Sequence, residues 1–471
     1  MSVIKFVKSV KEGSIDVVKN AEKAVLESKK INSEYNYFNA FDETALAQAM
    51  IVDKKVRKGI AGKLAGVIIS VKDCICVKGV ESTAGSAVLK GYRPLFDAAA
   101  VEKCRAEDAI IIGKTAQDEF GFGGFNVNIG NGFKIPLNPL DKSRSCGGSS
   151  GGAAGITQKA SFPHLAIAES TGGSIVNPAA FCGVVGLCPT YGRVSRYGLI
   201  DYANSLDKIG TMAKSCADAG LLLSVISGHD EKDSTSSNNK LQYFEFKNSV
   251  KGMKIGIVKE AFGEGVDSRI VDRVSDAIRK FEDKGAETVS VSLPTTFKYG
   301  IPTYYILAMC EASTNLAKYC GMRYGAHSEL KGMFNQYFSA VRTKNFGAEA
   351  KRRILLGTFA RMAGYRDAYY IKAAQARTRI IEEYKQAFKQ CDVLAAPTMP
   401  ILPPTFEEIS KLTPLQNYMA DILTVGPNLA GLPHLSLPCG KINDFSAGLQ
   451  LIGNHFEELE LLEVGNAYEQ K

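Results

Sequence analysis

The stretch SCGGSSGGAAG at residues 145–155 and the turn STGGS at 170–174 enclose a single apolar run, HLAIA at 164–168. Continuous apolar runs bounded by glycine turns are typical of strands that are buried on both faces of an α/β sheet. A glycine- and serine-rich tract by itself is more often a flexible linker, but this one lies between strongly apolar segments. Because only glycine lets the main chain approach another group so closely, the two turns predict backbone packed tightly around a ligand.

The same texture extends outward along the chain. Further short apolar segments are expected to be strands, at 65–71, 109–113, 253–258, 288–293, 393–396, 435–437 and 449–452. Apolar residues at helical spacing predict helices in the first forty residues, between the third and fourth of these strands, and over most of 302–389. We therefore expect one α/β domain over residues 1–471, with a helical N-terminal segment at 1–60 and a helical insertion at about 300–390 that lies over the sheet.

Composition excludes several classes of protein. With 45% hydrophobic residues and a net charge of +8, the 471-residue chain is neither collagen-like nor wholly disordered. This charge is compatible with binding of an anionic partner. It is spread over too many residues to indicate nucleic-acid binding by itself. No apolar run is long enough to span a membrane, and the N-terminus carries charge too often for a signal peptide. We expect a soluble cytoplasmic protein.

The eleven cysteines are scattered, with no CxxC pair and no matching histidine pair. This pattern favours buried free thiols over a disulfide framework or a zinc site, and we expect no metal.

Two ways of activating a serine are open at residues 145–155. The segment GGSSG at 147–151 matches the nucleophile-elbow pattern G-x-S-x-G, which requires a histidine base, but each of the five histidines is more typical of a structural or surface position. A neutral lysine can also serve as the base, and Lys72 ends an apolar run directly before Asp73. With an ordinary pKa, only about one lysine in 2,500 is neutral at pH 7. The pKa of Lys72 would therefore have to fall by about three units for it to act as a base. Desolvation at the end of a buried strand can supply such a shift.

Three segments, taken together and in this order, resemble the amidase signature family. They are GVIISVKDCICVKG at 66–79, CGGSSGG at 146–152 and STGGSIVNPAAFCGVVGLCPTYGRVS at 170–195. The resemblance continues over nearly the whole chain and is strongest to the A subunits of glutamyl-tRNA(Gln)/aspartyl-tRNA(Asn) amidotransferases. It implies an α/β/α sandwich, in which helices cover both faces of a central mixed sheet.

The resemblance also implies a Ser-Ser-Lys triad. It makes Ser174 the nucleophile, Ser149 a bridging serine and Lys72 the base that deprotonates Ser174 through Ser149. The backbone N–H groups of Thr171, Gly172 and Gly173 would form the oxyanion hole. The alternative for Ser149 is a turn hydroxyl that binds its own backbone.

The residues expected to bind substrate rest on the resemblance alone. Arg353 and Asp421 are expected to hold the α-carboxylate and the α-amino group of glutamine, with Tyr304 as a weaker candidate. A guanidinium matches a carboxylate bidentately, but Arg353 follows Lys351 and Arg352, so a solvated helix face is its alternative. For Tyr304 we favour core packing.

The chain departs from the family pattern at two positions and in one spacing. Ser170 stands where the family usually has aspartate, Val176 stands where it usually has arginine, and the two triad serines are one residue farther apart than usual. We hypothesise that the aspartate and arginine are partners that were lost together, because losing both members of a buried ion pair can be nearly neutral. Restoring the aspartate alone should then destabilise the protein.

The resemblance implies a glutaminase subunit of a heterotrimeric, tRNA-dependent amidotransferase. This chain would supply ammonia, whereas ATP, magnesium and most contacts with the misacylated tRNA would belong to a B subunit, and a C subunit would act as a small clasp. No cofactor is expected on this chain itself. The alternatives are a free-standing amidase that acts on small amides and an inactive scaffold that only positions the B subunit.

Overall fold

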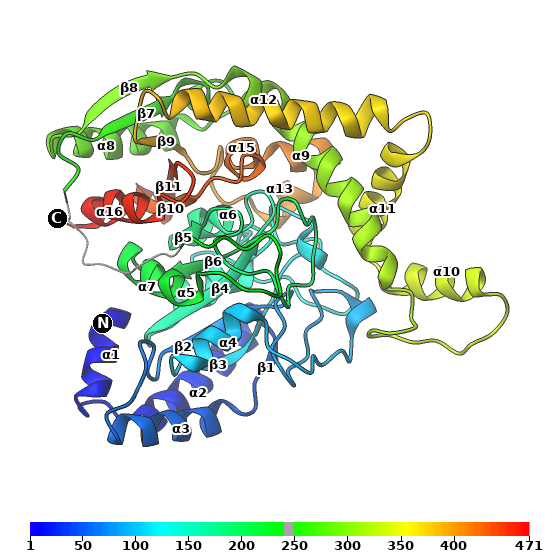
Figure 1. Ribbon diagram of the computed structural model, residues 1–471, viewed down its shortest axis with the longest axis horizontal. Coiled ribbons are helices and arrows are strands. Elements are labelled where there is room, and N and C mark those ends of the chain that lie inside the picture. The colour runs from blue at the N-terminus through cyan, green and yellow to red at the C-terminus, as the bar shows by residue number, and fades with distance from the viewer. Residues whose placement is uncertain (240–248, 471) are drawn as a thin grey trace.

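A computed structural model describes residues 1–239 and 249–470, and its strands form one sheet (Figure 1). The eleven strands lie in the order β1-β3-β2-β4-β6-β5-β10-β11-β9-β7-β8. Strand β2 is parallel to β3 and β4, whereas β4 is antiparallel to β6, so the sheet is mixed as expected. The strands are β1 Phe38–Phe41, β2 Ile68–Lys72, β3 Ile110–Thr115, β4 His164–Ser170, β5 Val185–Cys188, β6 Lys208–Ala213, β7 Lys254–Val258, β8 Glu287–Val291, β9 Val393–Pro397, β10 His434–Ile442 and β11 Phe445–Gly453.

Every strand expected from an apolar run is confirmed, but β1, β5 and β6 are not anticipated by the pattern. Strand β6 has the sequence KIGTMA, in which a lysine and a glycine interrupt the apolar residues. Strand β1 lies within the N-terminal segment expected to be helical, where it pairs antiparallel with β3 at the edge of the sheet. A four-residue edge strand has little apolar signature of its own, because its partner strand determines its conformation.

Helices cover both faces of the sheet. On one face α5 and α6 pack against each other and on central strands, and on the other α7, α8 and α16 form a second packed group (Figure 1). The helices are α1 Val3–Lys11, α2 Val17–Tyr35, α3 Ala45–Arg57, α4 Ala99–Ala106, α5 Gly151–Lys159, α6 Val176–Cys182, α7 Cys216–Ile226, α8 Ser268–Asp283, α9 Pro294–Asn315, α10 Phe334–Asn345, α11 Ala348–Arg361, α12 Lys372–Ala387, α13 Phe406–Ser410, α14 Pro414–Met419, α15 Val425–Leu429 and α16 Glu458–Glu469. The α/β/α sandwich inferred from the resemblance is therefore confirmed.

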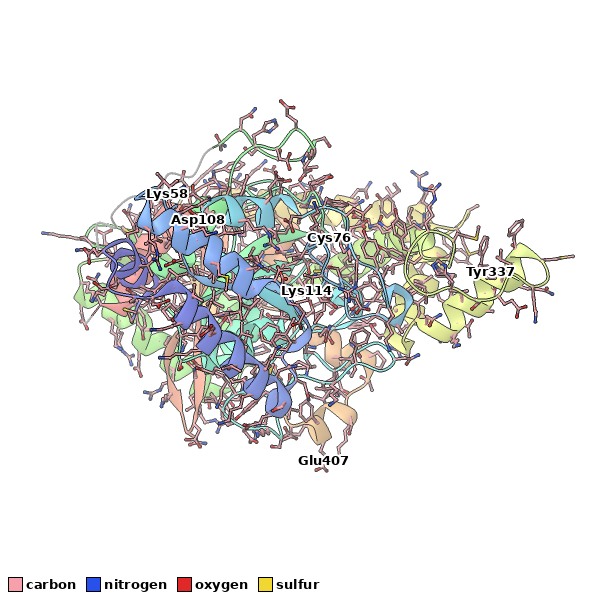
Figure 2. All side chains as sticks on the ribbon, turned by 90° about the horizontal axis from the view of Figure 1, so that it is seen from below. Lys58, Cys76, Asp108, Lys114, Tyr337 and Glu407 are labelled. Atoms are coloured by element: carbon pink, nitrogen blue, oxygen red, sulfur yellow. The ribbon has the colours of Figure 1, made fainter. Side chains whose placement is uncertain are left out.

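The segment expected to be a helical insertion consists of α9 to α12. Helix α9 packs against α11, α12 and α15, and α10 extends well beyond the sheet at the right of Figure 1. In Figure 2, Tyr337 of α10 lies near the tip of this arm, whereas Cys76 and Lys114 lie in the body of the molecule. Helix α9 carries Tyr304 to the turn after β4, as described below, and the position of these helices over the sheet stays a prediction.

The interior of the fold is rich in thiols. All eleven cysteines are free and all but Cys320 are buried. Among residues 1–239 and 249–470, no helix is long and apolar enough to cross a bilayer.

Candidate active site

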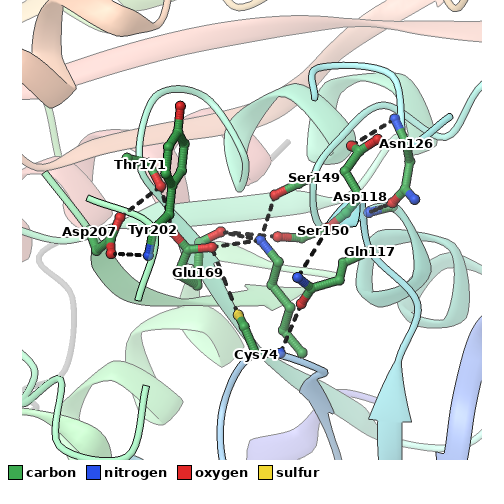
Figure 3. A network of polar contacts seen from close by, with 12 residues as sticks. Cys74, Gln117, Asp118, Asn126, Ser149, Ser150, Glu169, Thr171, Tyr202 and Asp207 are labelled. Carbon is green, nitrogen blue, oxygen red and sulfur yellow. Dashed lines mark hydrogen bonds and ion pairs between the residues drawn. The ribbon is translucent and has the colours of Figure 1, made fainter. Parts of the chain in front are cut away.

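Lys72 ends β2, a strand that is buried along its whole length and runs parallel to β4. Its side chain has no solvent exposure. The Nζ atom lies 2.7 Å from Ser149 Oγ, 2.8 Å from the backbone oxygen of Glu169 and 2.8 Å from Glu169 Oε2 (Figure 3). The structure thus brings Lys72 and Ser149 together, although 77 positions separate them in the chain.

Ser149 lies in the glycine-rich turn that leads into α5, and its peptide bond with Gly148 is cis. A Cβ atom on Gly148 would collide with the Asp118 carboxylate and lie 2.6 Å from the backbone nitrogen of Asn126. Glycine is therefore required for close approach, as the sequence indicates. The groups that Gly148 approaches belong to the protein itself, and the packing of the two turns around a ligand stays a prediction.

Ser174 lies in the turn between β4 and α6, and only 6% of it is exposed. The two turns are adjacent, because the backbone N–H of Ser150 donates to the carbonyl of Ser174 at 3.2 Å. This arrangement places the nucleophile and the bridging serine predicted from the sequence on neighbouring turns. Proton transfer between their hydroxyls stays a prediction.

The turn expected to form the oxyanion hole is enclosed by other segments. A Cβ atom on Gly172 would lie 2.8 Å from the ring of Tyr304, and one on Gly173 would collide with Thr424 and Asn177. The carbonyl of Thr171 accepts a hydrogen bond from the side-chain amide of Asn428. The backbone of this turn is thus closely packed, with no room for side chains at its two glycines.

Arg353 on α11 is buried rather than part of a solvated helix face, with 2% of it exposed. Its Nη1 donates to the hydroxyl of Tyr202 at 2.6 Å and its Nε to Glu349 at 2.8 Å. The guanidinium also lies 5.2 Å from the ring centroid of Tyr305. These contacts fix the guanidinium within an aromatic enclosure.

Asp421 follows α14, is also buried, and shares a neighbour with Arg353. The hydroxyl of Tyr305 donates to Asp421 Oδ2 at 2.6 Å, and Asn177 donates to Oδ1 at 2.8 Å. Burial raises the pKa of Asp421, while the hydroxyl of Tyr305 and the charge of Arg353 act against that rise. Tyr305 therefore lies between a buried cation and a buried carboxylate, and the sequence analysis did not identify it.

Tyr304 lies between this charged pair and the turn at residues 171–173. It is buried, as core packing predicts, but its ring also lies against Gly172. Its hydroxyl interacts with that of Tyr202, the partner of Arg353.

Glu169, on β4 beside Lys72, is the main site residue that sequence reasoning missed. Its only sequence signal is a charged residue between an apolar run and a glycine turn. Lys72 is fully buried as expected, but its surroundings are not purely apolar, because the Glu169 carboxylate lies 2.8 Å from its amine. The expectation of a purely apolar strand end around Lys72 is corrected accordingly.

Ser170 points to the opposite face of β4 from Glu169, because side chains alternate along a strand. Its partner across the antiparallel pair is Lys208 of β6. Lys208 is buried, burial lowers its pKa, and the thiol of Cys188 interacts with both Lys208 and Ser170. Position 170 therefore faces a buried lysine, Lys208. The arginine that the family pattern has at position 176 is a valine in this chain.

Comparison with known proteins adds to this geometry. The model of the amidase family matches residues 21–462. The A subunit of a glutamyl-tRNA(Gln) amidotransferase from Microcystis aeruginosa is 45% identical over 92% of this chain and 90% of its own length. The protein of the same name from Methanococcoides burtonii is 46% identical over 93% of this chain and 90% of its own length. The crystal structure of the Thermotoga maritima protein of that name superposes with a TM-score of 0.79 at 32% identity, covering 96% of this chain and 92% of that one.

Proposed function

This chain belongs to the amidase family, and from that premise we propose that it is the glutamine-hydrolysing A subunit of a tRNA-dependent amidotransferase. Relatives 45% and 46% identical over nearly the whole chain are named as A subunits of glutamyl-tRNA(Gln) amidotransferases. The single observation in the site that supports glutamine as substrate is the buried pair of Arg353 and Asp421, held on either side of Tyr305. A free amino acid offers one carboxylate and one ammonium group, which such a pair matches.

The proposed chemistry starts at Lys72. Its neutral amine takes the proton of Ser149 while Ser149 takes the proton of Ser174, and the Ser174 oxygen attacks the side-chain carbonyl carbon of glutamine. The N–H groups of residues 171–173 stabilise the oxyanion. The C–N bond then breaks, the proton returns to the departing nitrogen, and ammonia leaves. Water releases glutamate from the γ-glutamyl ester on Ser174.

Substrate orientation is assigned to the charged pair. The Arg353 guanidinium binds the α-carboxylate and Asp421 binds the α-ammonium group, so that the side-chain amide extends toward the glycine turn beside Tyr304. Uncharged aryl or alkyl amides have neither a carboxylate nor an ammonium group for this pair to bind. That difference argues against the free-standing amidase.

The ammonia is proposed to pass to a partner, the B subunit, which amidates Glu-tRNA(Gln) or Asp-tRNA(Asn) with ATP and magnesium bound there. Together with the C subunit, these chains form a cytoplasmic heterotrimer. The modest charge of +8 on this chain fits a protein that leaves most tRNA contact to its partner.

Ammonia release from glutamine tests the proposal. We would compare the chain alone, the chain with its B and C partners, and Ser174→Ala in the same assembly, and we expect hydrolysis that requires Ser174. Hydrolysis of unrelated amides by the lone chain, with none of glutamine, would favour the free-standing amidase. An assembly that amidates tRNA with added ammonium but hydrolyses no amide would identify an inactive scaffold.

A further inference from the structure

The outer side of α11 and of the turn that follows it carries a dense group of large apolar side chains. They lie within residues 355–369, at the right end of the molecule in Figure 1, and each is 40–70% exposed. This α11 patch consists of Leu355, Leu356, Phe359, Met362, Tyr365 and Tyr369. Contact of so many apolar side chains with water is unfavourable, so the patch points to a partner that covers it.

The α11 patch is continuous rather than scattered. Leu355 lies four residues before Phe359 and Met362 three residues after it, a spacing that places side chains side by side on one helix face. The ring centroids of Phe359 and Tyr365 are 4.4 Å apart, and those of Phe359 and Tyr369 are 5.8 Å apart. Because aromatic residues and methionine are enriched at the centres of protein interfaces, the patch has the composition of such a centre.

The opposite face of α11 is occupied by the fold itself. Arg353, Gly357 and Ala360 are buried there, and a Cβ atom on Gly357 would collide with the backbone of Met309 in α9. Arg353 is also the residue assigned to the α-carboxylate of glutamine. One helix therefore carries the exposed patch on its outer side and a proposed substrate ligand on its inner side.

The charges around the patch are mostly positive. Arg361, Arg366 and Lys372 are exposed, and none of them forms an ion pair within residues 1–239 and 249–470. The sequence of residues 351–372 contains one acid, Asp367. A partner surface with carboxylates around an apolar centre would complement this arrangement.

Two other occupants fit this surface less well. A second copy of the chain would bring the same cations to the other side of a two-fold interface, where like charges repel. A tRNA would attract the cations, but Leu355, Leu356 and Met362 have no ring on which a base can stack. The combination favours a different protein chain.

We propose that the α11 patch is the docking surface for the B subunit, an inference that rests on the proposed function. Ammonia released at Ser174 must reach the B subunit without loss to water, so that subunit has to dock against elements that form the glutamine site. Helix α11 is such an element, and its outer side offers the apolar area and the positive rim described above. The surface expected on the B subunit is an apolar centre surrounded by aspartate and glutamate.

The test is the affinity of this chain for the B–C pair, measured by titration of wild type, Phe359→Ser and Leu355→Ser. We expect each substitution to weaken binding by about tenfold or more, because truncating an anchor at the centre of an interface has an effect of that size. Arg366→Glu tests the rim. It should weaken binding by about fivefold or more at low salt and by less at high salt, since exposed charges are screened.

Matched controls lie far from the α11 patch. Leu26→Ser in α2 removes a leucine with the same 70% exposure as Leu355. Lys58→Glu, just after α3, reverses an exposed charge at the end of the molecule away from Tyr337 (Figure 2). Both variants should bind the pair as wild type does. Thermal unfolding should be unchanged in all five variants, because none of these side chains belongs to the core.

Binding of the B–C pair that is as tight in Phe359→Ser and Leu355→Ser as in wild type would overturn the inference, as would an equal loss in Leu26→Ser. If one serine variant does not fold, the other and Arg366→Glu decide.

Three further results would assign the patch to another occupant and also overturn the inference. They are an equal loss of affinity for the C subunit alone, a dimer of the free chain that Leu355→Ser dissociates, and a loss of tRNA binding while the pair stays bound. A wild-type chain that binds the pair but hydrolyses no glutamine refutes the proposed substrate, and the titration still tests the patch. A wild-type chain that does not bind the pair overturns both.

Discussion

At the scale of single residues, the site depends on charges that are buried beside specific partners. Arg353 combines a hydrogen bond to Tyr202 with packing against aromatic rings, and a lysine lacks the planar guanidinium that makes both contacts at once. Position 170 shows the converse, since a buried cation, Lys208, faces a serine that cannot neutralise it.

Arg353→Lys should raise KM for glutamine by at least about tenfold, because removing a bidentate hydrogen bond to a carboxylate in a buried site costs about 1.5–3 kcal/mol. We expect a smaller change in kcat, since the guanidinium binds a group remote from the reacting carbon. Steady-state kinetics of ammonia release measure both. Arg352→Lys, on the exposed side of α11, is the matched control and should behave as wild type. Equal effects of the two substitutions would contradict this assignment.

Ser170→Asp should stabilise the protein relative to Ser170→Asn by about 1 kcal/mol or more, because only the carboxylate can pair with the ammonium of Lys208. The sequence pattern alone predicts the opposite, since it considers only the missing arginine at position 176. Urea unfolding of the two variants decides the question. An asparagine variant as stable as the aspartate variant would favour the interpretation from sequence.

At the scale of elements, the site is formed where β2 and β4 end and two glycine turns meet. Strand β2 supplies Lys72, β4 supplies Glu169, and the turns before α5 and α6 supply the two serines. Because the glycines in these turns touch neighbouring backbone or rings, the turns are held by packing rather than free to move.

Gly172→Ala should lower kcat for glutamine by about tenfold or more, because its methyl group would lie 2.8 Å from the ring of Tyr304 and would displace the turn that carries the oxyanion donors. Glutaminase kinetics together with thermal unfolding check this result. Gly300→Ala in α9 is the control, since its methyl group would meet its nearest neighbour at an ordinary 3.4 Å. It should keep full activity and gain about 0.5–1 kcal/mol from better helix propensity. Unchanged kcat in Gly172→Ala would contradict the oxyanion assignment.

At the scale of the whole molecule, a buried carboxylate joins the helical arm to the body. Glu119 accepts the backbone N–H of Gly347, at the start of α11, at 2.9 Å and the hydroxyl of Ser86 at 2.5 Å. Burial raises the pKa of Glu119 to about 7. The folded state therefore keeps this proton over a pH range in which the unfolded chain has lost it.

The sign of the pH effect follows from that difference. Between about pH 4.5 and 7 the unfolded chain ionises Glu119 and the folded protein does not, so stability falls as pH rises. Glu119→Gln cannot ionise, and the fall should be smaller in this variant by about 2 kcal/mol. Denaturant unfolding at pH 5 and pH 7.5 measures it. Parallel stability curves for the two proteins would show that Glu119 is not protonated in the folded state.

Much of the fold was predictable from local pattern. The apolar runs at β2, β3, β4 and later strands, and the helices of α9 to α12, follow from periodicity that each segment carries by itself. Strands β1, β5 and β6 were not predictable in this way, because pairing with neighbours, rather than their own apolar residues, determines their conformation.

For this protein, the sequence by itself determined the class of fold, the family, and the three side chains of the predicted triad, because glycine sterics and motif order are local and covalent properties of the chain. Tertiary structure alone decided which charges meet. Glu169 beside Lys72, Lys208 opposite Ser170, and Arg353 near Asp421 across Tyr305 come from separate elements. The physical reason is that the proton affinity of a buried group depends on its neighbours through space, and these neighbours exist only once the helices and strands have packed.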